Sequence, residues 1–531
     1  MQQYSELLRT ILEKRGIKTL TEAEIFLNPD YKRDLHDPFK MKDMEKACVK
    51  LFEVIENKEK IVIYADYDCD GIPGAVILQD LFKKINYTNY KVYIPGRNSE
   101  GYGLNLSAIK QFAEERVKLL ITIDLGITAV SEVAQAEIDE IDVIITDHHL
   151  PTQTGLPKAY AILNPKIDDY PERMLCGAGV VFKLVQGFIK KYGEFYKINT
   201  SWEKWLLDMA GLSTLSDLVP LLGENRTIAY FGMKVLRKSP RSGLQKLLSK
   251  MNINQKYLTE DDIGFMVTPR LNAASRMGDP MMAYELLSTE DEVRAGIIAD
   301  HLSKINDDRK TMVTSIMREV NKKFEKREVK EVIVIGNPKW HVGVLGLIAG
   351  KISDEHKKPV FVWGKDENDI IKGSCRSDGS VSLVELMNET SEFFLEFGGH
   401  EFAGGFTVHN EKIHFLEDAL SVSYKKVKRN KKETEIVYDI KSDLSVVNIK
   451  NWREIEKLSP FGLANPKLIF LFENVKVENI KKFGKNGSGE HLEIIFSDIS
   501  KNKVKAVSFF SNNDSFKVHL SEDAKVNLLA T

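Results

Sequence analysis

The first part of the chain alternates short apolar runs with segments of helical periodicity. Runs rich in β-branched side chains occur at residues 61–65, 91–94, 119–123 and 142–146. Between them, residues 74–84 and 107–115 place apolar side chains at helical spacing. This alternation predicts a parallel sheet that is covered by helices on both faces.

The pattern changes twice before the chain reaches its second half. Residues 1–40 predict short helices, because prolines and charged residues interrupt any longer pattern. Helical periodicity then dominates from residue 179 to 287. The charged stretch 291–326 has apolar side chains at helical spacing and neither glycine nor proline after Gly296, which predicts one long helix connecting two domains.

A second alternation of strands and helices follows this predicted helix. Its apolar runs, at residues 331–336, 359–363 and 405–408, predict a smaller α/β domain. From residue 433 onward the pattern is that of β-structure, with predicted strands at 475–478, 491–496 and 505–509. Residues 526–531 also have a strand pattern that nothing closes, so we expect a C-terminally shortened version of a slightly longer protein.

The predicted fold class is α/β, divided into several domains. A chain of 531 residues exceeds what one hydrophobic core usually serves. We expect an N-terminal helical segment at 1–40, a parallel-sheet domain at 41–290, a connecting helix at 291–327, a smaller α/β domain at 328–432 and a β-rich domain at 433–531.

Composition and charge narrow the class of protein. With 43% hydrophobic residues, 29% charged residues and a net charge of −2, the chain is neither a disordered nor a globally basic protein. A polyanionic partner would therefore meet a local patch. The basic run 425–432 is either a solvated helix end or a phosphate contact. Four scattered cysteines without a CxxC pair, and no long apolar segment, favour a reducing cytoplasm and exclude a membrane span.

Carboxylates and imidazoles follow the predicted parallel strands. Asp66, Asp68 and Asp70 come directly after the first run, Asp124 follows the third, and His148 with His149 follow the fourth. Because the carboxyl ends of parallel strands meet at one edge of the sheet, these side chains should converge there. Such a set suits Mn²⁺ or Mg²⁺, and two cations sharing a carboxylate are the usual device for hydrolysing a phosphate ester.

Two other interpretations of these residues fit the sequence less well. The triplet followed by Gly71 matches the first half of an EF-hand loop, but Ile77 stands where the bidentate glutamate belongs and a strand precedes the loop. A single aspartate at a strand end is usually a helix cap. Several at successive strand ends favour a site, and the neighbouring carboxylates favour a site role over a structural one for the two histidines.

These residues resemble the DHH phosphoesterase family, in which Asp147-His148-His149 would be the name-giving motif. Longer blocks resemble its RecJ branch, the single-strand-specific 5′→3′ DNA exonucleases. They begin at Glu100, Cys176, Ser216, Gly223, Pro269, Trp340, Gly373 and Gly398, and a further block at Ser459 resembles the entry to an OB-fold domain. The resemblance covers nearly the whole chain after residue 40. It implies a DHH domain, a DHH-associated domain and a C-terminal OB-like β-barrel.

The resemblance also implies roles for individual residues. The metal ligands would be Asp66, Asp68, Asp70, Asp124, His148 and Asp217, with Asp124 bridging two ions and Asp66 either a ligand or the orienter of one. His149 would face the scissile phosphate, so the expected catalytic residues are His149, Asp124 and Arg276. The expected substrate-binding residues are Arg97, Tyr102, Arg270, Arg276, Ser374, Arg376, Gly398, Gly399 and His400. Those in the second domain would read the 5′-terminal phosphate, and Tyr102 would stack on a base or serve the turn that contains it.

Three positions depart from the family pattern. Pro73 stands where relatives often have a hydroxyl residue, Leu125 where they often have asparagine or cysteine, and Ser275 where glycine is usual. None of these changes removes an expected ligand. We therefore expect activity to persist.

The function implied is metal-dependent hydrolysis of single-stranded DNA from the 5′ end, releasing mononucleotides in repair and recombination. Two divalent cations, Mn²⁺ or Mg²⁺, would be the cofactors. Single-stranded DNA would be the partner, with a helicase and a single-strand-binding protein as further candidates, and the enzyme would be a cytoplasmic monomer. Two alternatives stay open: a DHH phosphodiesterase acting on short oligonucleotides or cyclic dinucleotides, and a DNA-binding family member without activity.

Overall fold

The computed structural model describes most of the chain. It covers residues 1–97, 100–151, 155–167, 169–325, 327–427, 437–484, 491–512, 515–516 and 518–531. These residues form two compact units. Unit 1 comprises Met1–Leu35, Pro220–Tyr230 and Thr434–Thr531, and unit 2 comprises His36–Val219 and Phe231–Glu433.

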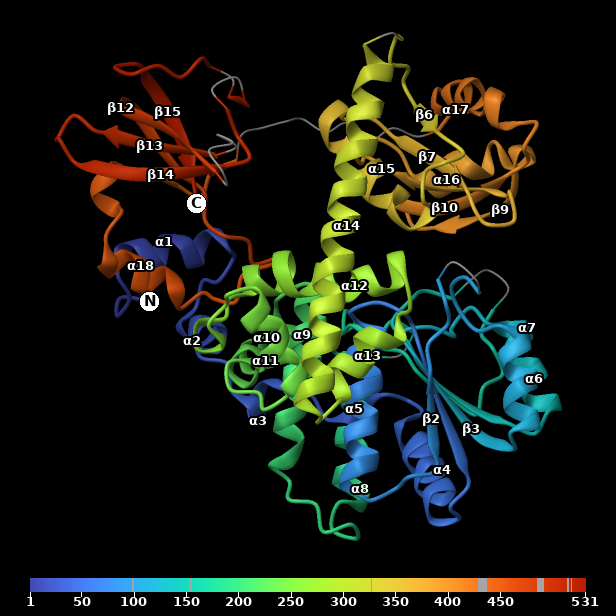
Figure 1. The fold of residues 1–531 in the computed structure, drawn as a ribbon. Helices are drawn as coiled ribbons and strands as arrows, with labels where there is room; N and C mark the ends of the chain where they lie inside the picture. The colour runs from blue at the N-terminus through green and yellow to red at the C-terminus, as the bar shows by residue number, and fades with distance from the viewer. Residues whose placement is uncertain are drawn as a thin grey trace. The chain divides into compact units, whose positions relative to one another are not determined.

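Unit 2 begins with a five-stranded sheet in the order β2-β1-β3-β4-β5, in which every neighbouring pair is parallel. The strands are β1 (Lys60–Ala65), β2 (Tyr90–Tyr93), β3 (Val117–Ile123), β4 (Asp142–Thr146) and β5 (Ala161–Leu163). Helices α4 (Met44–Glu56), α5 (Gly71–Lys84) and α8 (Gly177–Tyr192) cover one face, and α6 (Leu106–Glu114) and α7 (Val130–Ile138) cover the other (Figure 1). The parallel sheet predicted from the alternation is confirmed.

The sheet packs as its apolar pattern requires. The strands β1 and β3 are buried on both faces, and side chains such as Val62 and Leu120 join Ile109 and Phe112 of α6 in one hydrophobic cluster. Gly74 lets α5 approach closely, because a Cβ atom there would lie 2.6 Å from the Ile123 side chain. This close packing fixes the start of α5 beside the ends of β1 and β3, where the candidate site lies.

A series of helices follows the first sheet. They are α9 (Leu207–Ser216), α10 (Gly223–Leu236), α11 (Ser242–Lys250), α12 (Thr268–Met277) and α13 (Met281–Ser288). The long helix predicted after them is confirmed as α14 (Glu292–Phe324), whose N-terminus is capped by the Asp291 carboxylate. Among the described helices, none is both long enough and apolar enough to cross a membrane.

The second sheet of unit 2 is mixed and follows α14. It has the order β6-β7-β8-β10-β9, with β6 parallel to β7 and the other neighbours antiparallel. Its strands are β6 (Ile333–Gly336), β7 (Val360–Lys365), β8 (Ile371–Arg376), β9 (Phe394–Gly399) and β10 (Ala403–Val408). Helices α15 (Leu345–His356), α16 (Leu383–Asn388) and α17 (Leu416–Tyr424) accompany it. Strands β8 and β9 were missing from the pattern-based prediction.

Unit 1 combines the N-terminal helices with the C-terminal β-structure. Its helices are α1 (Glu6–Lys14), α2 (Leu20–Leu27), α3 (Tyr31–Asp34) and α18 (Ile449–Glu456); its strands are β11 (Ile440–Lys441), β12 (Phe470–Phe483), β13 (His491–Ser497), β14 (Lys503–Phe509) and β15 (Lys525–Ala530). Leu8 and Phe26 share one hydrophobic core with Phe472 and Phe496. The predicted final strand is β15, which pairs antiparallel with β12. Residues 428–432 of the basic run lie outside the described residues.

Candidate metal centre and phosphate-binding groups

The candidate site lies at the carboxyl edge of the first sheet. Asp66 follows the last residue of β1, Asp124 follows β3, and His148 comes two residues after β4. Asp217, which no strand pattern could place, is the C-terminal cap of α9. The structure brings all of these side chains together.

The side chains form three overlapping groups that have the donor atoms of a metal site. The groups are Asp124 with His148 and His149, Asp70 with His148 and Asp217, and Asp66 with Asp68 and Asp124. Within each group the potential ligand atoms all lie within 4.8 Å of one another. Asp124 and His148 each belong to two groups, so neighbouring cations in this cluster would share ligands.

Asp70 is held by the N-terminus of α8. Its Oδ2 atom accepts a hydrogen bond of 2.6 Å from the Gly177 N–H, and its Oδ1 atom accepts one of 2.7 Å from the Ala178 N–H. The Ser213 hydroxyl also donates to Oδ1. The positive end of the helix dipole favours this carboxylate. Because a carboxylate has about four acceptor positions, Asp70 keeps capacity for a cation while its orientation is fixed.

Asp68 is oriented by hydrogen bonds within its own loop, whereas Asp66 and Asp124 each have a carboxylate oxygen without a hydrogen-bond donor in the described chain. Asp68 Oδ1 accepts hydrogen bonds from the backbone N–H groups of Asp70 and Gly71, at 2.8 and 3.3 Å. The Oδ1 atoms of Asp66 and Asp124 are buried and find no hydrogen-bond donor among the described residues. Buried oxygens of this kind normally have a partner, so they are natural positions for a cation.

The carboxylates repel one another strongly. Burial, and then the neighbouring aspartates, raise the pKa of Asp66 and Asp124 well above the ordinary value. Burial followed by repulsion from Asp70 raises the pKa of Asp68, and the same causes raise that of Asp217 to about 9. Divalent cations would offset this repulsion, and the set of oxygens with one or two imidazoles fits Mn²⁺ or Mg²⁺.

The two histidines have different protonation behaviour. Burial lowers the pKa of His148 to about 4, so at neutral pH its ring is uncharged, as a metal ligand must be. Its Nε2 atom lies 3.1 Å from Asp124 Oδ1, 3.7 Å from Asp70 Oδ2 and 3.9 Å from Asp217 Oδ2. At neutral pH these contacts are therefore those of a neutral imidazole, not ion pairs.

His149 is oriented by Asp147. Burial alone would lower the pKa of His149, but the contact of its Nδ1 atom with Asp147 Oδ1, at 2.8 Å, outweighs burial and raises that pKa. Asp147 also accepts hydrogen bonds from the backbone N–H groups of Ile127, His148 and His149. Asp147 thus orients the motif and belongs to none of the three candidate groups.

The backbone at Asp124 is unusual and explains a nearby glycine. Asp124 has a φ of +61°, a conformation that aspartate tolerates better than most residues. A Cβ atom at Gly177 would lie only 2.5 Å from Asp124 Cβ. The glycine therefore lets α8 reach Asp70 with its N–H groups without displacing Asp124.

Helix α12 lies against the aspartate triplet and brings Arg276 near it. Asn272 Oδ1 accepts a hydrogen bond of 2.8 Å from the Cys69 N–H. Burial, and then the charges of Arg97, Arg309 and Arg376, lower the pKa of Arg276 to about 10. The Arg97 guanidinium lies 5.2 Å from the Tyr67 ring centroid. This concentration of positive charge is what a polyanionic substrate requires.

The expected phosphate-binding residues of the second sheet lie on β8 and at the turn between β9 and β10. A Cβ atom at Gly346, in the first turn of α15, would lie 3.1 Å from an Arg376 guanidinium nitrogen and 3.6 Å from Ser374 Oγ. Ser374 and Arg376 thus lie beside the N-terminus of a helix, which is a favourable position for an anion.

The turn after β9 reaches the candidate metal centre. Gly399 has a φ of +146°, and a Cβ atom there would lie 2.3 Å from the Ala403 carbonyl oxygen, so the turn requires glycine. Among the described residues, apart from its chain neighbours, none has an atom within 4 Å of a Cβ placed on Gly398. The rings of His400 and His149 are stacked, with centroids 6.1 Å apart and planes 7° apart. The structure therefore brings together site residues from both sheets of unit 2.

Tyr102 lies beside the same centre. Its side chain is 53% exposed, and its hydroxyl donates a hydrogen bond of 3.4 Å to the Asp124 carbonyl oxygen. The hydroxyl also lies 3.5 Å from His149 Nδ1. Arg270 Nη1 instead donates a hydrogen bond of 2.8 Å to the Met266 carbonyl oxygen.

Several residues that shape the site were not found from the sequence. Ser213 and Asn272 hold Asp70 and the Cys69 backbone, and Arg309 of α14 adds charge beside Arg276. Gly177 lies in the block that begins at Cys176 and resembles the RecJ branch, and that resemblance was the sequence signal that could have pointed to it. Nothing in the local pattern distinguishes Ser213 or Arg309 from ordinary helical residues.

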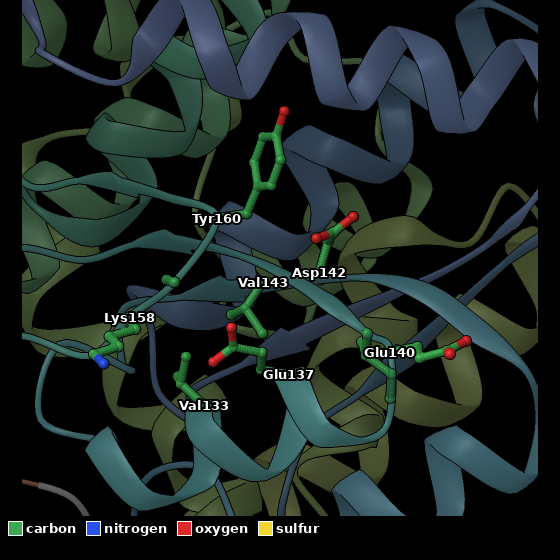
Figure 2. Close-up of a pocket in the computed structure, with 9 residues that line it drawn as sticks. Val133, Glu137, Glu140, Asp142, Val143, Lys158 and Tyr160 are labelled. Carbon is green, nitrogen blue, oxygen red and sulfur yellow. The ribbon is translucent and has the colours of Figure 1, made fainter.

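A separate cavity lies at the opposite end of β4 (Figure 2). It measures about 380 Å³ and is lined by Glu137, Glu140, Asp142, Lys158 and Tyr160, among others. Asp142 starts β4, whereas the candidate site follows Thr146, roughly 13 Å further along the strand at about 3.3 Å per residue. This cavity therefore belongs to a different edge of the sheet from the metal cluster.

Comparisons with known proteins agree with this architecture. Family models match residues 60–213 ("DHH family, N-terminal domain"), 329–428 ("DHHA1 domain") and 438–531 ("RecJ OB domain"). The fold and the site thus define a DHH-family protein with an associated DHHA1 domain and an OB domain, as the sequence predicted.

The relatives narrow this class to one branch. The single-stranded-DNA-specific exonuclease RecJ of Bacillus subtilis is 35% identical over 90% of this chain, and that of Haemophilus influenzae is 31% identical over 77%. The chain covers 60% of the first relative and 73% of the second. It belongs to the RecJ family of the DHH phosphoesterases.

Solved structures support the same fold. RecJ from Thermus thermophilus, in complex with Mn²⁺, aligns with a TM-score of 0.80 at 23% identity, covering 98% of this chain and 74% of that chain. An exonuclease RecJ bound to manganese aligns with a TM-score of 0.64 at 27% identity, covering 74% of this chain and 97% of that chain. The predicted fold class is confirmed.

Proposed function

We propose that the chain is a metal-dependent exonuclease that hydrolyses single-stranded DNA from its 5′ end and releases mononucleotides. The observation that carries this proposal is the cluster in which Asp124 and His148 are each shared between groups of potential ligands, beside arginines from both sheets of unit 2. The RecJ relatives are named single-stranded-DNA-specific exonucleases, which supports the same substrate class here. A role in DNA repair and recombination accords with that activity.

Six residues would hold two divalent cations, Mn²⁺ or Mg²⁺: Asp66, Asp68, Asp70, Asp124, His148 and Asp217. Asp124 would be the bridging ligand. When bound, such a pair of cations supplies a hydroxide near neutral pH and stabilises the leaving oxygen. The buried Oδ1 atoms of Asp66 and Asp124 and the neutral ring of His148 support this set, and a related exonuclease RecJ binds manganese.

The remaining residues of the centre would position the substrate. His149, oriented by Asp147, would face the scissile phosphate and donate a hydrogen bond to one of its oxygens. Arg276 and Arg97 would balance the negative charge that grows on the phosphoryl oxygens during hydrolysis. Tyr102, whose ring is half exposed, would stack on a base near the end of the strand.

Polarity would come from the second sheet of unit 2. Ser374 and Arg376, beside the first turn of α15, would bind the 5′-terminal phosphate together with the backbone at Gly398, Gly399 and His400. The stacking of the His400 ring on the His149 ring supports a position for this group beside the proposed metal ligands. An end held there would leave the first phosphodiester bond beside the residues proposed to hold the cations.

The test is hydrolysis of a 5′-phosphorylated single strand with Mn²⁺ by the variant Asp124→Ala. We expect turnover to fall by at least about 10³-fold, because the shared ligand is lost. Asp354→Ala, which changes an exposed aspartate on α15, serves as the control and should retain normal turnover. Near-normal turnover by Asp124→Ala would refute the role of this cluster.

Two other functions would be separated by substrate choice. A DHH phosphodiesterase for short oligonucleotides or cyclic dinucleotides would cut a dinucleotide faster than a long strand. A DNA-binding member without activity would bind a strand tightly and leave it intact with either metal. The RecJ OB domain at residues 438–531 favours the long strand.

We further propose that the protein acts as a cytoplasmic monomer, beside a helicase and a single-strand-binding protein. We propose a functional division of the chain into residues 1–40, 41–290, 291–327, 328–432 and 433–531. Limited proteolysis and sedimentation of the purified chain would test the division and the monomeric state.

A further inference from the structure

Helices α12 and α14 place a group of unsatisfied donors side by side. Arg270 lies on α12, and Asn306 and Arg309 lie one turn apart on α14. The Nε atoms of both arginines and the Nδ2 atom of Asn306 are buried and have no acceptor among the described residues. Arg270 is 8% exposed and Asn306 is fully buried.

Other hydrogen bonds fix the orientation of these side chains. An Arg309 guanidinium nitrogen donates to Asn306 Oδ1 at 3.0 Å, and Arg270 Nη1 donates to the Met266 carbonyl oxygen at 2.8 Å. Each guanidinium is thus held at one end while its Nε–H group is left free. Donors that are buried without an acceptor cost free energy, whereas an anion could satisfy all three at once.

The charges lead to the same conclusion. Burial, and then the charge of Arg270, lower the pKa of Arg309. Burial also lowers the pKa of Arg270, which the neighbouring Asp307 only partly offsets. The charge of Arg270 acts on Arg309, and in the described chain no ion pair joins either arginine to a carboxylate, so a bound anion would offset the repulsion between them.

Arg276 is near both the candidate metal cluster and Arg309, because the charges of Asp68 and Arg309 both contribute to its pKa after burial. After burial, the neighbouring charge that shifts the pKa of Arg309 is Arg270, and the one that shifts the pKa of Arg270 is Asp307; no aspartate of the candidate metal cluster contributes to either. The pair is therefore placed for a phosphate other than the one at the metal cluster.

We propose that Arg270, Asn306 and Arg309 form an additional phosphate subsite, which binds an internal phosphate of the single strand. The planar guanidinium groups suit the phosphate oxygens, and the partly exposed Arg309 leaves the subsite open to solvent. The assignment rests on the proposed function. It adds a contact that connects the strand to the long helix α14.

The test is binding of a 3′-fluorescein, 5′-phosphorylated single strand in EDTA, measured by anisotropy at several salt concentrations. Arg309→Ala should weaken binding about tenfold and reduce the salt slope by about 0.7, the value for one lost contact with a single strand. Arg318→Ala removes the same charge from an exposed position on the same helix and should change neither quantity. Arg309→Lys should restore the salt slope but not the full affinity.

Strands with one uncharged methylphosphonate at successive linkages would identify the phosphate. For the wild type, one internal position should weaken binding about tenfold; for Arg309→Ala the same position should have no effect. The proposal is overturned if Arg309→Ala binds like Arg318→Ala, or if the internal penalty persists in Arg309→Ala. Thermal melting of each variant, including the conservative Arg309→Lys, shows whether weaker binding comes from a lost phosphate contact or from a protein that no longer folds.

A failure of the proposed subsite can be distinguished from a failure of the proposed exonuclease function. A wild type that does not bind a single strand at all would refute the exonuclease proposal itself. A wild type that binds, and an Arg309→Ala variant that binds equally well, would refute only the subsite. Because binding is measured without cleavage, a catalytically inactive preparation still tests the contact.

Discussion

Replacing Gly177 by alanine should displace the metal centre, although no proposed ligand is changed. The new Cβ atom would lie 2.5 Å from Asp124 Cβ and 2.9 Å from Asp124 Cγ. Carbon atoms in contact prefer about 3.5–4.0 Å, so α8 and Asp124 must separate by roughly 1 Å. The 2.6 Å hydrogen bond from the Gly177 N–H to Asp70 would then lengthen to roughly 3.6 Å, beyond the usual range.

Both stability and activity should respond. Losing a hydrogen bond to a charged group costs about 1.5–3 kcal/mol, and alanine returns about 0.4–1 kcal/mol through the unfolded state. We therefore expect the free energy of unfolding to fall by about 1–2 kcal/mol. A displacement of about 1 Å in a catalytic group can lower turnover by about 10²-fold.

The assay is single-turnover release of the first nucleotide with Mn²⁺, accompanied by urea unfolding. Gly179→Ala, two residues further along α8, is the matched control because its Cβ atom would meet Cys176 Sγ at an ordinary 3.4 Å. That control should keep normal turnover and gain up to about 1 kcal/mol of stability. Turnover of Gly177→Ala within about twofold of the wild type would refute the proposed dependence of the centre on this close approach.

Three further results are expected. Asp217→Asn should raise the melting temperature in EDTA, because it removes one of several buried, mutually repelling carboxylates. The same variant should lower turnover with Mn²⁺ by at least about 10²-fold. A lower melting temperature in EDTA would contradict this reasoning. Arg376→Ala should abolish the kinetic preference for a 5′-phosphate over a 5′-hydroxyl end, and a preserved preference would exclude Arg376 from that contact. Burial raises the pKa of Glu319, but hydrogen bonds from Asn337, Trp340 and Lys323 outweigh burial and lower that pKa to about 2. Because this folded-state pKa lies below the unfolded value, the stabilisation is present above about pH 4.5 and is lost as pH falls toward 2. Glu319→Gln should thus be less stable by about 1 kcal/mol at pH 7, with the difference in urea midpoint shrinking below about pH 4.5; a constant difference would argue against ionisation as its cause.

The sequence predicted the parts of the fold that depend on periodicity. The strands that bear Asp66, Asp124 and His148 are buried on both faces, so their apolar runs were visible, as was the helix α14. Strands β8 and β9 escaped because they carry glycines and polar residues near the second half of the site. These strands, IKGSCR and FLEFGG, lack the clear alternation of apolar and polar side chains that marks a strand.

The candidate site was only partly visible for a related reason. Asp217 caps a helix instead of following a strand, so only the family resemblance suggested it. Arg309 lies in a long charged helix, where a solvated arginine is the ordinary expectation. The hydrogen bonds of Asp70 with α8 depend on the packing of that helix, which no local pattern specifies.

The most direct test of the central proposal is digestion of one single strand carrying either a 5′ or a 3′ label, with Mn²⁺ and with EDTA. The proposed mechanism predicts that the 5′ label appears first, as a mononucleotide, and that EDTA abolishes its release. Earlier release of the 3′ label would contradict the proposed polarity. Undiminished release in EDTA would contradict a metal centre at Asp124.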